Sequence, residues 1–212
     1  VEAARHYLKA AMAGEVPVFE WLHCDSNGRQ FPCEVRLVRL PGEPILIRCS
    51  VTDISERQRY QREIERLAYS EFGLAALSHR GGVLGWPEPM PAAAKYALSH
   101  LFVQAEFGLC CPVSMTDSLA RTLRKFGDPA LVERVLPQVT SQDFDTLRQG
   151  AMFMTEQGAG SDVSATEVTA AAQDDGTWRI HGDKWFCSNP DAGFAMVLAR
   201  SESQPGLKLS LI

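Results

Sequence analysis

The strongest constraint in this 212-residue sequence is a change of pattern near Tyr69 and Ser70. Before this point, runs rich in β-branched and aromatic residues alternate with short turns; after it, alanine, leucine, glycine and proline become frequent. The first pattern predicts strands, whereas the second favours helices joined by loops. We therefore expect an α+β chain of two unlike parts, divided at about residue 69.

Residues 1–69 predict a helix followed by an antiparallel meander. The helix is expected over residues 2–12. Strand-like runs follow at 16–24, 30–40 and 44–54, and turns at 25–28 and 41–43 separate them. Within the second run, Val35 and Leu37 alternate with polar neighbours, so one face of the sheet is expected either to be exposed to solvent or to lie against another part of the protein.

A charged helix is expected to follow the last strand. Ser55 and Gln58 have the spacing of a capping box, and we expect one continuous helix over residues 53–77. The motif VTDISERQRYQREIERLAY, together with the preceding strands and their Asn-Gly turn, resembles the C-terminal half of a PAS sensory domain with its outgoing signalling helix. This resemblance implies that Asp53 and Ile54 couple the sheet to the helix that carries the signal.

The resemblance to PAS domains is incomplete. The first strands and the short helices that cover a PAS ligand pocket have no counterpart in this sequence. We therefore expect a half-sheet that holds no ligand.

Residues 70–148 predict a helical region, and residues 149–212 predict a β domain. A loop rich in proline and glycine is expected at 80–91, with helices at 92–107, 114–126 and 129–139. Strands are expected at 149–155, 164–172, 177–181, 184–188 and 193–200, with a hairpin turn at 174–176. The expected architecture is a helical segment followed by an antiparallel β domain.

The stretch MFMTEQGAGSDVSAT, residues 152–166, is a loop candidate between two expected strands. A P-loop needs Lys-Ser or Lys-Thr after its last glycine, and a Rossmann fingerprint needs a helix there. The sequence instead has Ser161-Asp162-Val163, followed by strand-type residues, and Ser161 lacks the flanking glycines of a nucleophile elbow. What remains is a loop whose two glycines can approach a pyrophosphate.

A second motif, Lys184 to Asn189, places aromatic residues next to a hydroxyl. A flavin ring needs a face on which to stack and hydrogen-bond donors for its N5 and carbonyl oxygens. The second motif offers the aromatics Trp185 and Phe186 next to the Ser188 hydroxyl. The first motif offers a hydroxyl at Thr155 on the strand end, while the Ser161 hydroxyl can donate to the pyrophosphate. The two motifs together predict a flavin site.

The two motifs resemble the FAD-binding middle domain of the acyl-CoA dehydrogenase family, whose pattern is T-E-x-x-x-G-S-D and then G-x-K-x-[WF]-x-[TS]-N. The upstream stretch AEFGLCCPVSMTDSLARTLRKFGDPALVERVLPQVTS is similar to the family's N-terminal helical domain, and the Lys-Trp-Phe variant is similar to its adaptive-response branch. The residues that this resemblance implies for FAD binding are Met152, Phe153, Met154, Thr155, Gly160, Ser161, Phe186, Cys187 and Ser188.

The resemblance also implies individual roles. Thr155 would lie on the flavin ring, and Ser161 would also lie near the substrate. Phe186 would stack where many members have tryptophan, and Ser188 would hydrogen-bond N5 where many have threonine. The implied substrate is an acyl-CoA thioester; the electron acceptor is unknown, and a homo-oligomer is expected if the remaining helices of the family were present.

The family's reaction removes an acyl α proton with a glutamate and transfers the β hydride to flavin N5. No glutamate in this sequence matches that base, and the sequence stops at Ile212 within the expected β domain. We therefore expect a flavin site without activity. Two other interpretations stay open: a PAS-type sensory module whose flavoprotein half is an output or a redox input, and a fusion fragment with no activity.

Composition narrows the classes of protein to which this sequence can belong. A net charge of -5 argues against a general nucleic-acid partner, and no apolar run of 18 residues or signal-peptide pattern is visible. The six cysteines include no CxxC pair and the five histidines no HExxH, so no metal site is expected. Scattered cysteines indicate reduced thiols in a cytoplasmic protein.

Overall fold

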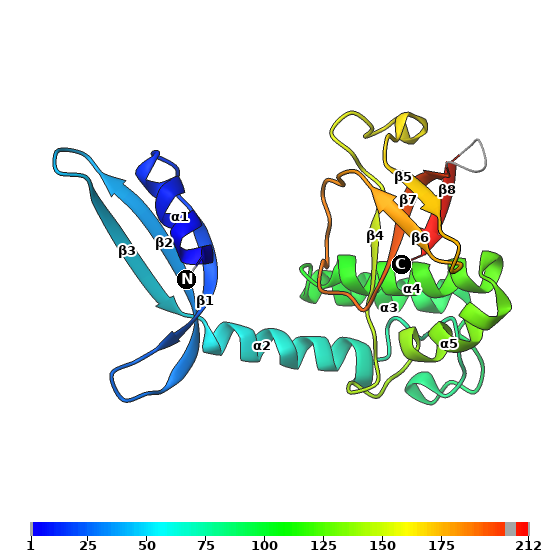
Figure 1. Ribbon diagram of the computed structural model, residues 1–212. Helices are drawn as coiled ribbons and strands as arrows, with labels where there is room; N and C mark the ends of the chain where they lie inside the picture. Colours follow the sequence, from blue (N-terminus) through cyan, green and yellow to red (C-terminus); the bar gives the residue numbers. More distant parts are fainter. Residues whose placement is uncertain (1, 202–206, 212) are drawn as a thin grey trace. The chain divides into compact units, whose positions relative to one another are not determined.

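The computed structural model describes residues 2–201 and 207–211, and the chain divides after Ile64 into two compact units (Figure 1). The first unit contains a helix and an antiparallel meander in which β2 lies between β1 and β3. Its elements are α1 (Glu2–Met12), β1 (Val18–Cys24), β2 (Gln30–Leu40) and β3 (Leu46–Asp53), and α2 (Ser55–Arg66) follows. The predicted helix and meander are confirmed, although β1 and β3 begin two residues later than expected.

Helix α1 covers one face of this sheet (Figure 1). Because strand side chains alternate between faces, Cys33, Val35 and Leu37 of β2 point to the same side, where they are buried together with Ala11 of α1. The ring of Tyr7 stacks on that of Phe19 at 3.8 Å between centroids. The apolar positions of β2 therefore form the core of the first unit.

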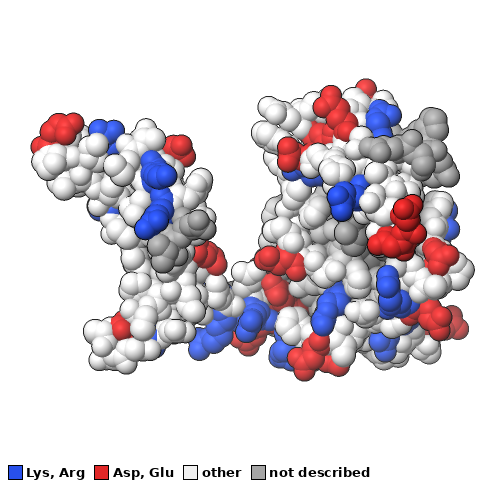
Figure 2. Space-filling view, viewed as in Figure 1, with Lys and Arg blue, Asp and Glu red and all other residues white. Residues whose placement is uncertain are grey.

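The expected capping box is wrong, as is the expected continuous helix. The backbone N–H of Ser55 donates to the Asp53 carboxylate at 2.8 Å, while the Gln58 side chain donates to Glu20 on β1 at 3.1 Å. Helix α2, which carries both basic and acidic side chains (Figure 2), ends at Arg66, and a π-helical turn, Leu67–Glu71, follows. The chain then turns at Gly73, whose φ of +56° lies in the left-handed region that favours glycine.

The second unit combines three helices with a sheet (Figure 1). The helices are α3 (Ala92–Ala105), α4 (Cys110–Phe126) and α5 (Pro129–Val139); α4 begins four residues earlier than expected. Leu119 and Leu123 of α4 pack with Val135 and Val139 of α5 and with Met196 of the sheet. These apolar side chains recur at helical spacing, and their burial holds the helices and the sheet together.

The sheet of the second unit is mixed, so the expectation of an antiparallel β domain is wrong. Its strands are β4 (Gly150–Phe153), β5 (Thr169–Ala172), β6 (Trp178–His181), β7 (Phe194–Ser201) and β8 (Leu207–Leu211). They lie in the order β4-β7-β5-β6, with β8 also paired to β7. β7 runs parallel to both β4 and β5, because long connections separate these strands and let the chain cross over before it pairs.

The segment 184–188, expected to be a strand, is a loop instead. Phe186 and Asn189 both have positive φ angles, of 55° and 58°, and these conformations do not occur in a regular strand. The hairpin turn at 174–176 is confirmed by backbone hydrogen bonds from Gln173 N–H to the Thr177 carbonyl and from Gly176 N–H to the Gln173 carbonyl, and by a φ of +83° at Gly176.

A buried carboxylate joins α3 and α4 to the preceding loop. Asp117 of α4 forms an ion pair with Lys95 of α3. Among the described residues of α3, Lys95 is the residue that is buried. The same carboxylate accepts hydrogen bonds from His79 at 2.9 Å and from Ser78 at 3.0 Å. The ion pair with Asp117 therefore anchors α3 to α4. No helix in the described part of the chain is both long and apolar enough to cross a membrane.

Candidate functional site

The loop that follows β4, residues 154–166 and here called the glycine loop, is held by one buried carboxylate. Glu156 is 7% exposed, and its Oε1 accepts a hydrogen bond from Lys184 Nζ at 2.6 Å. Its two oxygens also accept from the backbone N–H groups of Glu167, at 2.6 Å, and Val168, at 3.1 Å. The carboxylate therefore fixes the start of the loop to the segment that leads into β5.

The protonation state of Glu156 follows from these partners. Burial by itself would raise the pKa of Glu156, but the hydrogen bonds from Lys184 and from the two backbone N–H groups, with the lysine's charge, lower it below its ordinary value. Glu156 is thus a structural anion. Sequence reasoning placed it in the loop motif without a role, because charged side chains are ordinarily exposed and their mutual burial leaves no local pattern.

Residues 184–189, here called the aromatic segment, lie against both ends of the strand β4. Lys184 Nζ donates to the carbonyl of Met154 at 3.1 Å, and the backbone N–H of Trp185 donates to the carbonyl of Thr155 at 2.8 Å. At the other end, Asn189 Nδ2 donates to Gln149 Oε1 at 3.0 Å. The structure therefore brings together the two motifs that the sequence singled out.

Phe186 is held in an unusual conformation at the surface. Its side chain is 82% exposed, and its φ of 55° lies in the left-handed region, which an aromatic residue rarely adopts. Such a backbone costs on the order of 1 to 3 kcal/mol, and residues of this kind cluster at functional sites. The neighbouring Trp185 ring meets the Phe186 ring at 65°, with 6.4 Å between centroids. An exposed ring on a strained backbone fits a group that stacks on it.

The hydroxyls predicted to contact a flavin have no hydrogen-bond partner in the part of the chain that the structure describes. Within the described residues, no hydrogen bond involves the side chains of Thr155, Ser161 or Ser188. A Cβ added at Gly158 or Gly160 would meet no atom within 4 Å, so open space lies beside both glycines. Free donors, an exposed ring and an open glycine backbone are groups that a flavin nucleotide can use. The residues present therefore fit FAD.

The other predicted flavin residues occupy varied positions. Met152 is partly buried and packs against the core shared by α4, α5 and β7. Phe153, Met154 and Cys187 are partly buried, and Gly160 is exposed. No hydrogen bond, ion pair or ring contact joins Ser161 to the aromatic segment within the described residues. The assignment of these residues to FAD stays a prediction.

The two predicted signalling residues lie where β3 ends and just before α2 begins, in the first unit. Ile54 is 3% exposed, and Asp53 is exposed and pairs with Arg29 at 3.6 Å. Hydrogen bonds from Ser55, supported by Arg29, lower the pKa of Asp53 below its ordinary value.

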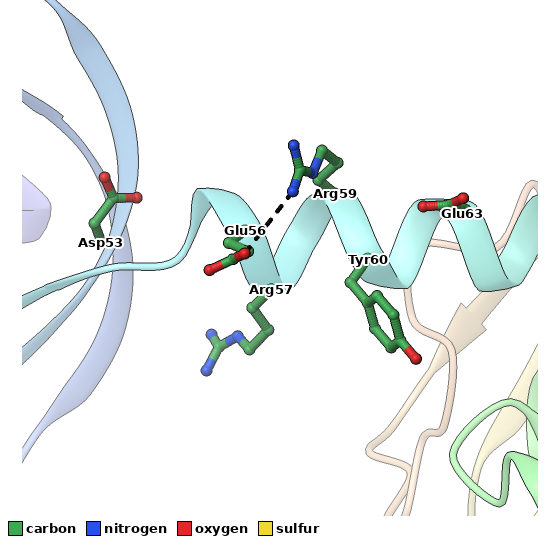
Figure 3. A pocket seen from close by; sticks show the side chains of 6 residues that line it. All are labelled: Asp53, Glu56, Arg57, Arg59, Tyr60 and Glu63. Carbon is green, nitrogen blue, oxygen red and sulfur yellow. Dashed lines mark ion pairs between the residues drawn. The ribbon is translucent and has the colours of Figure 1, made fainter.

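A shallow hollow of about 540 Å³ runs along α2 (Figure 3). The side chains that line it are all exposed and of mixed charge: Asp53, Glu56, Arg57, Arg59, Tyr60 and Glu63. The hollow contains no residue of the glycine loop or the aromatic segment.

In the described parts of the chain, no group of three or more His, Cys, Asp and Glu side chains is arranged to hold a metal ion.

Comparison with known proteins connects the second unit to one family. Residues 67–146 match the model of the adaptive response protein AidB N-terminal domain, and residues 151–212 match that of the acyl-CoA dehydrogenase middle domain. Acyl-CoA dehydrogenase family member 11 of Caenorhabditis elegans is 37% identical over 100 residues, which are 45% of this chain and 16% of the relative.

Two further proteins are similar to the chain. The 3-methylmercaptopropionyl-CoA dehydrogenase of Ruegeria pomeroyi is 32% identical over 161 residues, 69% of this chain and 26% of the relative. An acyl-CoA dehydrogenase of Bacillus anthracis, solved in complex with FAD, has the same fold: its TM-score is 0.58 at 20% identity, covering 74% of this chain and 26% of that one. The chain thus spans 16% and 26% of the length of the two curated relatives.

Residues 67–212 therefore resemble acyl-CoA dehydrogenases in sequence and in fold, as the two motifs predicted. The match to the adaptive-response domain agrees with the branch suggested by the sequence. The resemblance of the first unit to a PAS domain stays a prediction.

Proposed function

We propose that residues 65–212 are part of an acyl-CoA dehydrogenase of the adaptive-response branch and bind FAD through the glycine loop and the aromatic segment. The observation that carries the proposal is the exposed, left-handed Phe186 on a segment whose two ends are fixed by Lys184 and Asn189. The hydroxyls of Thr155 and Ser188, which form no hydrogen bond within the described residues, supply donors for the cofactor. FAD, when bound, supplies a hydride acceptor for the dehydrogenation of an acyl-CoA thioester.

The chain's own residues bind and orient the cofactor in this proposal, and they do not move the substrate proton. Glu156 is the buried carboxylate of the glycine loop, and its oxygens are already engaged by Lys184 and two backbone N–H groups. A carboxylate whose pKa is lowered and whose lone pairs already accept hydrogen bonds is a weak general base. We therefore expect that added acyl-CoA leaves the absorbance of FAD bound to this chain unchanged.

The Phe186→Ala variant tests the flavin site. Loss of one aromatic stacking partner is expected to weaken FAD binding by about 5- to 150-fold, since such stacking contributes about 1 to 3 kcal/mol. Phe186→Trp keeps a stacking face and is expected to retain binding. The measurement is a titration of flavin fluorescence quenching with the purified chain.

Trp178→Ala is the matched control for this titration, because Trp178 is an exposed aromatic of the second unit outside both motifs. It is expected to bind FAD as the unaltered chain does. Equal affinities for Phe186→Ala and the unaltered chain, or no binding by the latter, would contradict the proposed function.

We propose, as a second function, that the first unit transmits a conformational signal into α2 in the manner of a PAS domain. The supporting observation is the contact between sheet and helix: Arg57 of α2 pairs with Glu20 at 3.0 Å and with Glu34 at 3.4 Å. These two glutamates lie directly opposite each other on β1 and β2, where like charges repel. Arg57 therefore both relieves this repulsion and fastens the first turn of α2 to the sheet.

The Arg57→Ala variant is expected to loosen α2 from the sheet. Exposed ion pairs contribute about 0.2 to 1 kcal/mol each, so hydrogen exchange in the first turn of α2 should rise by roughly 2- to 10-fold at low salt. The difference from the unaltered chain should shrink at about 1 M salt, because screening weakens the pairs. Arg59→Ala, which loses one exposed pair with Glu56 within α2, is the control. Equal exchange in the two variants would count against the coupling.

A further inference from the structure

The hydroxyl of Thr116, on α4, is the centre of a buried hydrogen-bond chain. Thr116 is 0% exposed, and its Oγ1 donates to the carbonyl of Pro112 at 2.7 Å. The same oxygen accepts from the backbone N–H of Gly150 at 2.9 Å and lies 3.4 Å from the hydroxyl oxygen of Tyr69. A threonine hydroxyl has one hydrogen and two lone pairs. Because the Thr116 hydroxyl hydrogen is donated to the Pro112 carbonyl, Tyr69 is the donor in the contact between the two hydroxyls.

Gly150, the first residue of β4, lies directly against α4. A Cβ at this position would be 3.1 Å from both Thr116 Cα and Leu119 Cδ1, so only glycine allows this approach without a shift of the neighbours. The carbonyl of Gly150 in turn accepts from Asn189 Nδ2 at 3.3 Å, and that amide also donates to Gln149 Oε1. One backbone residue therefore connects α4 to the end of the aromatic segment.

The aromatic segment is clamped at both ends by this arrangement. Lys184 holds its start through Glu156 and the Met154 carbonyl, and Asn189 holds its end through Gly150. Asparagine is among the residues that tolerate the left-handed region, in which Asn189 lies at a φ of 58°. Of the residues between Lys184 and Asn189, Phe186, Cys187 and Ser188 are the ones expected to face the flavin.

We propose that Thr116 is a positioning residue for the flavin site, acting through Gly150 and Asn189 on the aromatic segment. The effect on FAD binding rests on the proposed function. The effect of Thr116 on the position of residues 184–189 does not depend on a cofactor. Thr116 fixes where β4 begins, β4 fixes Asn189, and Asn189 fixes the direction in which the segment presents Ser188 and Phe186. Thr116 itself does not touch the cofactor.

The Thr116→Val variant tests the inference, because valine keeps the shape and removes the hydroxyl. Without it, the Gly150 N–H and the Tyr69 hydroxyl lose their acceptor. Hydrogen exchange of residues 184–189 in the cofactor-free chain is expected to rise about 10-fold, and the Kd for FAD is expected to rise by a similar factor. Thr116→Ser, which keeps the hydroxyl, is expected to restore both.

A general loss of stability is separated from positioning by Leu123→Ala. Leu123 is 2% exposed on the same helix and makes no hydrogen bond to β4 through its side chain, so the variant destabilises the unit without releasing Gly150. Exchange at residues 184–189 should rise more in Thr116→Val than in Leu123→Ala, compared under conditions that give both variants the same free energy of unfolding. An equal rise in both variants, or no rise in Thr116→Val, would overturn the inference.

The two proposals fail in different ways. If the unaltered chain binds no FAD but Thr116→Val still releases residues 184–189 selectively, the cofactor assignment fails and the positioning by Thr116 stands. If the unaltered chain binds FAD and Thr116→Val changes neither exchange nor affinity, the positioning role is wrong and the flavin site stands.

Discussion

Asp117→Asn is expected to lower the free energy of unfolding of the second unit by about 3 to 5 kcal/mol, the usual effect of removing one partner from a buried ion pair. The side chains of Asp117 and Lys95 are each 7% exposed, and that of His79 is 3% exposed. Asparagine offers no negative charge to the lysine, which would be left buried and unpaired. Chemical denaturation followed by circular dichroism measures the change.

The pH dependence of stability provides a second measurement on the same group. Burial would raise the pKa of Asp117, but hydrogen bonds from His79 and Lys95, with their charges, outweigh it and lower the pKa from 3.8 to about 2. A carboxyl whose pKa is lower in the folded than in the unfolded chain contributes stability above the unfolded value and loses it as pH falls through the folded value. The unaltered chain should therefore lose this contribution between about pH 4 and pH 2, and Asp117→Asn should lack that part of the dependence.

Arg121→Ala is the matched control for Asp117. Arg121 lies 3.7 Å from the same carboxylate, but its side chain is 56% exposed, so its loss should cost no more than about 1 kcal/mol. A change of less than about 1 kcal/mol in Asp117→Asn would contradict the role given to this cluster.

Glu156→Gln is expected to destabilise the second unit by a similar amount, about 3 to 5 kcal/mol, and to abolish measurable FAD binding. Glutamine cannot compensate the charge of Lys184, whose side chain is 7% exposed. Only one oxygen would remain to accept from the N–H groups of Glu167 and Val168, which the carboxylate binds with its two oxygens. The start of the glycine loop would then be held to β5 and to the aromatic segment by fewer interactions, with the backbone hydrogen bond from Trp185 to Thr155 remaining.

Denaturation and flavin titration of the same preparation measure both effects of Glu156→Gln. Gln157→Ala changes the next, exposed residue of the loop and should leave stability within about 0.5 kcal/mol of the unaltered chain. Unchanged FAD affinity in Glu156→Gln would show that the ion pair does not support the site.

The elements with strong local patterns were predicted from the sequence. The helix over residues 2–12, the strand over 30–40 and the helix over 129–139 appear with the expected bounds. Local patterns are visible in a linear sequence because they involve neighbouring residues. Examples are the alternation of apolar residues, a proline at the first helical position and the turn at 174–176. The glycine loop and the aromatic segment were likewise recognised as two motifs, and the family matches support that recognition.

The failed expectations involve partners that are distant in the sequence. The segment 184–188 has the composition of a strand, but its ends are fixed by Glu156 and by Gly150, and these anchors impose a loop. The parallel pairing of β4 with β7 depends on how a connection of some forty residues crosses the sheet, which no local pattern specifies.

The sequence by itself determined the two-part organisation, most of the helices and strands, and the residue types that suit a flavin, because propensity, periodicity and motif spacing act over a few neighbouring residues. The tertiary structure alone decided that Glu156 and Lys184 are buried together, that Asp117 gathers partners from three segments, and that Thr116 holds the start of β4. A charged or hydroxyl side chain has the same local appearance whether it is solvated or buried. Only the folded chain shows which partner stabilises it in place of water.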